Sequence, residues 1–153
     1  MNDYLKLLAQ RSRTDAPEMS SEVTEALAQL DQELATLTAQ LEVEHYGPAV
    51  GLDGASEAYR LVVRCHEWQP NRPTWSLKVC DATPNCQWRA TWTVQGVGRR
   101  RRARILQALP AFLSDYVQVL AAANKTERPA AQRIQEMARI LSAPAAPVGH
   151  QDR

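Results

Sequence analysis

Hydrophobic residues recur at helical spacing between residues 20 and 44. Steps of four and three residues separate the members of this seam, which are Val23, Leu27, Leu30, Leu34, Leu37 and Leu41. Ser20 or Ser21 can cap the start, and Gly47 with Pro48 ends the segment. The pattern predicts a heptad helix. Because a short helix needs a packing partner, the seam packs either on the rest of this chain or, as a coiled coil, on a second copy.

Alternation of apolar and polar residues then predicts three strands, at about 58–68, 74–81 and 86–95. Short turns join these segments, so neighbouring strands are antiparallel and form a meander. One face is aromatic and aliphatic. Three of the four tryptophans lie between residues 75 and 92, and we expect the core to be centred there. The opposite face carries Arg60, Arg64, His66, Lys78 and Arg89.

The C-terminal third of the chain predicts a helical pair, at 99–123 and about 127–142. Pro110 falls inside the first helix and predicts a kink or a split there, because proline removes one helical hydrogen bond. Residues 143–153 are predicted to be a disordered tail. The fold class is therefore α+β: a single domain over 20–142 in which helices cover one face of a three-stranded antiparallel meander.

Residues 1–19 are interpreted as an N-terminal amphipathic peptide and linker. A short helix is expected over 2–12, and Pro17 breaks any continuation. Tyr4, Leu5 and Leu8 give this helix an apolar side. Two interpretations stay open. The helix either docks into a groove of a partner protein or packs back on its own domain.

Charge is distributed unevenly along the chain, although the net charge is only +1. Residues 1–48 hold three basic and nine acidic groups, whereas residues 98–153 hold ten basic and four acidic groups. The two ends can therefore attract each other, and the basic end can attract an external polyanion. The most concentrated charge is a block of five arginines at the start of the predicted helix, comprising Arg99, Arg100, Arg101, Arg102 and Arg104.

The order of the predicted elements resembles the double-stranded RNA-binding domain. A helix, three antiparallel strands, a Gly-x-Gly turn (Gly96 to Gly98), a basic block and a helix follow one another. In that family, Lys and Arg residues at the start of the last helix straddle phosphates and recognise duplex shape rather than sequence. The chain departs from the family in the register of its alanine and following cation, and in its long heptad helix.

These observations predict a small non-enzymatic binding protein that contacts a nucleic-acid backbone. The arginine block supplies the main contacts, helped by Arg60, Arg64 and Arg89. Alternatively, the block is solvated or neutralised by the acidic helix. The chain would then act as a protein-interaction adaptor or assembly factor through residues 20–44 and the N-terminal peptide. With the nucleic-acid function, residues 20–44 would form a homodimer or pack within the chain. The residues expected to bind a partner are Tyr4, Leu5, Leu8, Leu27, Leu30, Leu34 and Leu37.

Other classes of function lack a signal in the sequence. No catalytic triad, phosphate loop or paired carboxylate is present, so we expect neither catalysis nor a cofactor. Cys65, Cys80 and Cys86 lack the paired spacing of a zinc site, so no metal is expected. Their odd number favours a reducing, cytoplasmic location. No apolar run approaches the length of a membrane span.

Overall fold

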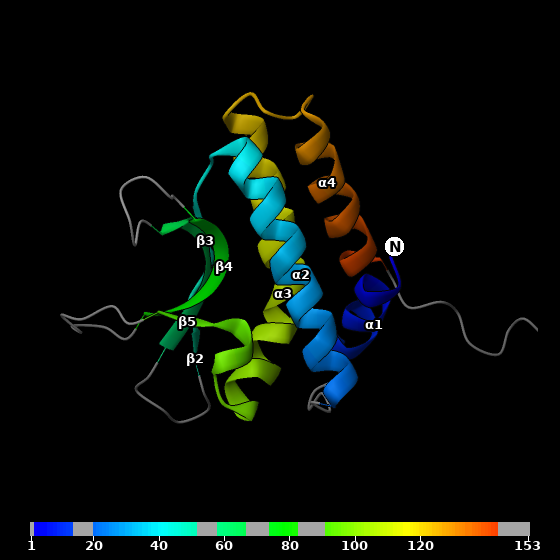
Figure 1. Ribbon diagram of the computed structural model, residues 1–153, viewed down its shortest axis with the longest axis vertical. Coiled ribbons are helices and arrows are strands. Elements are labelled where there is room, and N and C mark those ends of the chain that lie inside the picture. Colours follow the sequence, from blue (N-terminus) through cyan, green and yellow to red (C-terminus); the bar gives the residue numbers. More distant parts are fainter. Residues whose placement is uncertain (1, 14–19, 52–57, 67–73, 83–90, 144–153) are drawn as a thin grey trace, which may run out of the picture.

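The computed structural model describes residues 2–13, 20–51, 58–66, 74–82 and 91–143. Four helices lie on one side of an antiparallel sheet, which confirms the α+β class (Figure 1). The helices form two layers. α2 and α3 lie against the sheet, and α1 and α4 cover them from outside. The elements are α1 (Asp3–Ser12), α2 (Ser21–Leu41), β1 (His45–Tyr46), β2 (Val50–Gly51), β3 (Ala58–His66), β4 (Thr74–Asp81), β5 (Thr91–Thr93), α3 (Arg99–Ala122) and α4 (Pro129–Ser142).

The predicted meander is present as β3, β4 and β5 in that spatial order. Its last strand, β5, ends earlier than expected, because a turn of 3-10 helix begins at Val94. The first part of the predicted strand falls within residues 83–90, which lie outside the described residues. The other edge of β3 pairs with β1 and β2. These two-residue strands were not predicted, because so short a segment shows no alternation.

The heptad helix is present as α2, and its seam is used within the chain. The side chain of Ser20 accepts a hydrogen bond from the Val23 amide at 3.3 Å and caps the start. Leu27, Leu30 and Leu34 have no exposed area, and Leu37 is half-buried. The sheet contacts α2 on one side, and α1 and α4 contact it on the other. The seam is therefore unavailable to a second copy in this conformation, which corrects its assignment as a partner-binding surface.

α3 runs uninterrupted from Arg99 to Ala122, so the helix does not split at Pro110. The other expected outcome, a kink at that position, stays a prediction. Packing on both sides holds the helix together where one hydrogen bond is lost. Phe112 and Tyr116 are the two largest fully buried side chains among the described residues. α3 is long and apolar enough to pass a length-and-composition test for a membrane span. The core helix of a folded domain also passes this test, and the apolar side chains of α3 here line the core.

The buried core extends from the helices to the inner face of the sheet, and it is not centred on Trp75 and Trp92. The Tyr116 hydroxyl donates to the Val43 carbonyl at 2.8 Å, and burial raises the pKa of this hydroxyl. A β-carbon on Gly47 would lie 2.7 Å from the Phe112 ring, so the chain needs glycine where it passes this ring. Trp75 and Trp92 are only half-buried at the edge of this core.

The N-terminal helix α1 belongs to the same core. Leu5 and Leu8 have no exposed area, and α1 contacts α2, α3 and α4. The interpretation of this segment as a peptide outside the folded domain is therefore corrected. Leu5 and Leu8 cannot anchor a partner while the helix stays in place. Tyr4 is only partly buried, and its hydroxyl donates to the Glu33 carboxylate on α2.

We expect Leu8→Ala to lower the free energy of unfolding by about 2–5 kcal/mol, because it leaves a cavity in a filled core. Lys6→Ala on the exposed side of the same helix is the matched control, with an expected change of about 0.5 kcal/mol or less. Urea denaturation followed by circular dichroism measures both. Equal, small effects would show that α1 adds little to the fold.

Candidate nucleic-acid interface

The arginine block forms the first turn of α3. Gly98 occupies the N-cap position, has no side chain to cap the helix, and is followed by no acidic residue in the first turn. The Arg102 amide makes the first intrahelical bond, to the Gly98 carbonyl at 2.9 Å. The amides that precede it have no intrahelical acceptor, and the helix dipole adds partial positive charge at this end. Amides, dipole and arginines therefore all favour an anion here.

Two arginines of the block are held against the protein. The Arg101 guanidinium lies over the Tyr59 ring, 4.4 Å from its centroid, and 5.9 Å from that of Trp92. Arg102 Nη1 donates to Thr24 Oγ1 of α2 at 3.3 Å. The Nε of Arg102 is buried and has no hydrogen-bond partner among the described residues. Thr24 gave no signal in the sequence, because it lies 78 residues from Arg102.

The remaining arginines differ in exposure. Arg99 and Arg100 are exposed, and neither has an ion pair or a hydrogen bond from its side chain within the described part of the chain. Arg104 is half-buried. The acidic residues at the start of α2 therefore do not neutralise Arg99 and Arg100 within the described structure. This geometry keeps two cations available beside an uncapped helix start.

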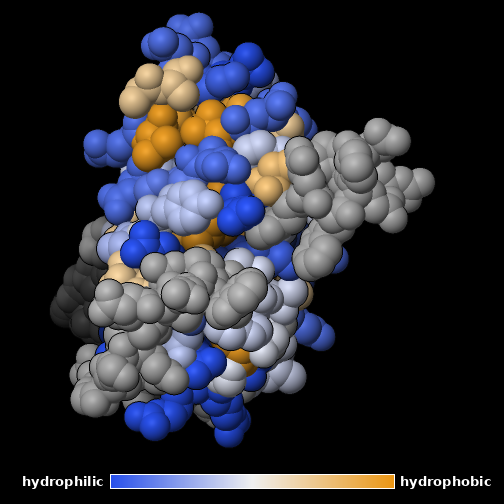
Figure 2. All heavy atoms as spheres, turned by 90° about the vertical axis from the view of Figure 1, so that its left-hand side faces the viewer, coloured by the Kyte–Doolittle hydropathy of each residue, from blue (hydrophilic) through white to orange (hydrophobic). Residues whose placement is uncertain are grey.

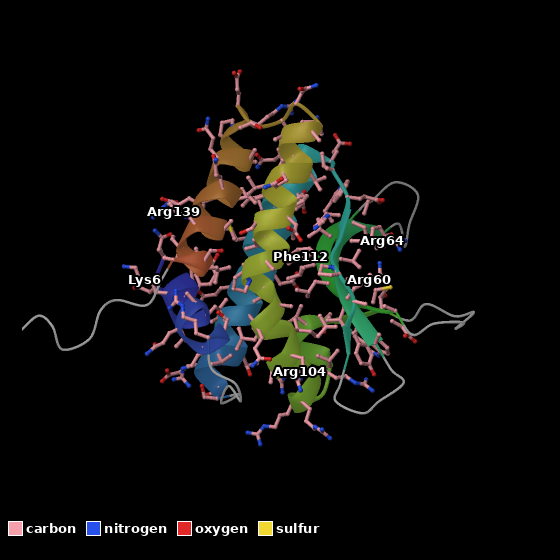
Figure 3. The ribbon with its side chains drawn as sticks, turned by 180° about the vertical axis from the view of Figure 1, so that it is seen from behind. Lys6, Arg60, Arg64, Arg104, Phe112 and Arg139 are labelled. Atoms are coloured by element: carbon pink, nitrogen blue, oxygen red, sulfur yellow. The ribbon has the colours of Figure 1, made fainter. Side chains whose placement is uncertain are left out.

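The structure does not bring the other predicted arginines to this end of α3. Arg60 and Arg64 lie on the face of the sheet that points away from the helices, whereas Arg104 lies near the start of α3 (Figure 3). Arg89 lies outside the described residues. The predicted interface is therefore divided, and among the predicted arginines that the structure describes only those of the block lie at the helix start.

A second surface lies between α1 and α2. It is a groove of about 620 Å³ with apolar atoms of Leu7 and Ala26 in its lining. Its exposed acidic rim consists of Asp3, Glu22 and Glu25, none of which forms an ion pair within the residues that the structure describes. The groove lies on the other side of α2 from Thr24 and the arginine block, as the helical spacing requires.

One end of this groove is closed by a charged network. Arg133 of α4 donates to Glu33 through Nε at 2.5 Å and through Nη2 at 3.0 Å. This bidentate bond lowers the pKa of the Glu33 carboxyl and raises that of the Arg133 guanidinium. Arg133 Nη1 also donates to Asn2 at 2.9 Å and to Glu136 at 2.6 Å. The network ties α1, α2 and α4 together beside the unpaired acids.

The two cysteines that the structure describes do not converge. Cys65 and Cys80 are unpaired thiols on opposite faces of the sheet, since Cys65 alternates with the outward-facing Arg64 while Cys80 pairs with Arg60. Cys86 lies outside the described residues. Across the described ranges, no three His, Cys, Asp or Glu side chains are grouped as metal ligands would be. The absence of a bound metal stays a prediction.

Comparison with known proteins adds no relative. No family model, curated protein or solved structure matches the chain. The likeness to the double-stranded RNA-binding domain thus stays one of element order and of the Gly96–Arg104 motif. Function has to be argued from the two surfaces described above, the basic first turn of α3 and the acidic groove between α1 and α2.

Proposed function

We propose that the protein is a small non-enzymatic binding protein that contacts a nucleic-acid backbone through the first turn of α3. The observation that carries the proposal is that two arginines of the block contact the protein whereas two others are exposed. Arg101 and Arg102 hold the turn against Tyr59 and Thr24, while Arg99 and Arg100 stay exposed and unpaired within the described structure.

The unbound arrangement is electrostatically unfavourable, and a phosphate would relieve it. Arg99 and Arg100 add full positive charges to the positive end of the helix dipole, which costs stability in the free protein. A phosphate at this position would accept hydrogen bonds from the helix amides and from the planar guanidinium groups. Such contacts read the backbone and carry no base sequence, so the proposed interaction depends on charge and shape.

We expect the pair Arg99→Ala and Arg100→Ala to weaken binding of a fluorescent RNA duplex of about 20 base pairs. Two lost phosphate contacts should reduce the slope of log affinity against log salt by about two units. Fluorescence anisotropy between about 50 and 200 mM salt measures this slope. Arg139→Ala is the control, since Arg139 is exposed on α4 (Figure 3). An unchanged slope in the double variant would rule out the α3 turn as the contact surface.

A second candidate function is a protein-interaction adaptor, and the groove between α1 and α2 favours it. Its apolar lining and unpaired acidic rim suit a basic amphipathic helix, which would place leucine-like side chains over Leu7 and cations beside Glu22 and Glu25. The partner would then bind in this groove and not to the leucine seam of α2, which is buried within the protein. The reducing, cytoplasmic location stays a prediction for either function.

We expect the pair Glu22→Lys and Glu25→Lys to weaken binding of a lysine- and leucine-rich helical peptide at least about tenfold, because attraction at the rim becomes repulsion. Calorimetric titration measures the affinity. Gln32→Lys, an exposed site elsewhere on α2, is the matched control for added positive charge. Peptide binding that survives the rim variant unchanged would remove the groove as a docking site.

A further inference from the structure

The outer face of the sheet carries a group of residues that the α3 turn does not use. Tyr46 of β1 pairs with Val62 of β3, and side chains of paired residues point to the same side. Arg60 and Arg64 lie two positions to either side of Val62 and therefore share its face. Tyr46 thus lies between two arginines. His45, the neighbour of Tyr46, faces inward and stacks on Tyr116 with ring centroids 5.7 Å apart.

Tyr46 is unusual in its exposure. At 45% it is the one large apolar side chain that is exposed among the described residues. Hydrophilic residues lie beside smaller hydrophobic patches on this side of the molecule (Figure 2). An exposed aromatic ring is suited to contact a flat, unsaturated group of a ligand.

The two arginines supply charge next to this ring. Tyr46, Arg60 and Arg64 line a common hollow of about 270 Å³, together with Cys80, Asp81 and Ala82. Arg64 Nη1 is 3.4 Å from the Tyr46 hydroxyl, a long bond, and the buried Arg64 Nε has no partner among the described residues. Arg60 has no hydrogen bond or ion pair there either. Arg60 and the donors of Arg64 that do not bond Tyr46 can therefore bind anions on either side of the ring.

We infer that this face binds single-stranded nucleic acid, with one base stacked on Tyr46 and the adjoining phosphates bound by Arg60 and Arg64. The combination of a ring and flanking cations matches the alternation of bases and phosphates along a strand. A duplex does not fit, because its base faces are covered by their neighbours, whereas an unpaired base can present its face to the ring. The site lies on β1 and β3, is separate from the α3 turn, and does not depend on it.

We expect Tyr46→Leu to weaken binding of a fluorescent thymidine strand of about ten nucleotides by about 5- to 150-fold, because the stacked ring is lost. Tyr46→Phe keeps the ring and should stay within about threefold of the unsubstituted protein. The pair Arg60→Ala and Arg64→Ala should also weaken binding and flatten its salt dependence. Anisotropy gives the affinities, and circular dichroism verifies that each variant is folded. A strand carrying 5-iodouracil should crosslink to Tyr46.

Binding measurements with both the duplex and the strand distinguish this inference from the proposed function. Strand binding that Tyr46→Leu leaves unchanged, but that falls with Arg99→Ala and Arg100→Ala, would overturn the sheet site and leave the α3 proposal standing. If Tyr46→Leu weakens strand binding while Arg99→Ala and Arg100→Ala leave duplex binding unchanged, the sheet site is upheld and the α3 proposal fails. An unsubstituted protein that does not bind the strand would overturn the inference outright.

Discussion

Burial of α2 and α3 from both sides is the constraint on which the rest of the structure depends. The sheet covers one side of this helical layer, and α1 and α4 cover the other. Leu30 and Leu34 consequently have no exposed area. Asp31 fixes α2 to the sheet, since its carboxylate accepts the Leu77 amide at 3.2 Å, and burial raises the pKa of that carboxyl. A helix so enclosed presents only its ends and its remaining polar positions to a partner.

This enclosure explains where the charged surfaces lie. The first turn of α3 extends to the edge of the layer, where Arg99 and Arg100 reach solvent while Arg101 and Arg102 contact the protein. The polar positions of α2 face the other way, toward α1, and there they form the acidic rim of the groove. Opposite charges are thus kept apart by the body of α2 instead of neutralising each other.

Sequence patterns predicted the helices and strands better than the surfaces against which these elements pack. Periodicity predicted α2, α3, α4 and the meander, because repeated burial of one face leaves a period in the sequence. It did not show that α1 completes the core or that the α2 seam is internal, since an apolar stripe looks the same whichever surface covers it. Tyr46 was missed because its strand is two residues long. The division between anchored and exposed arginines depends on Tyr59 and Thr24, which are distant in sequence and carry no motif.

Hydrogen–deuterium exchange of the protein with and without an RNA duplex tests the central claim most directly. The first amides of α3 lack intrahelical acceptors, so they should exchange rapidly in the free protein. Bound phosphates would accept hydrogen bonds from them, and slower exchange is predicted at the start of α3, around residues 99–101. Protection confined to the α1–α2 groove, or no change at the α3 turn under conditions where the duplex is bound, would contradict the account.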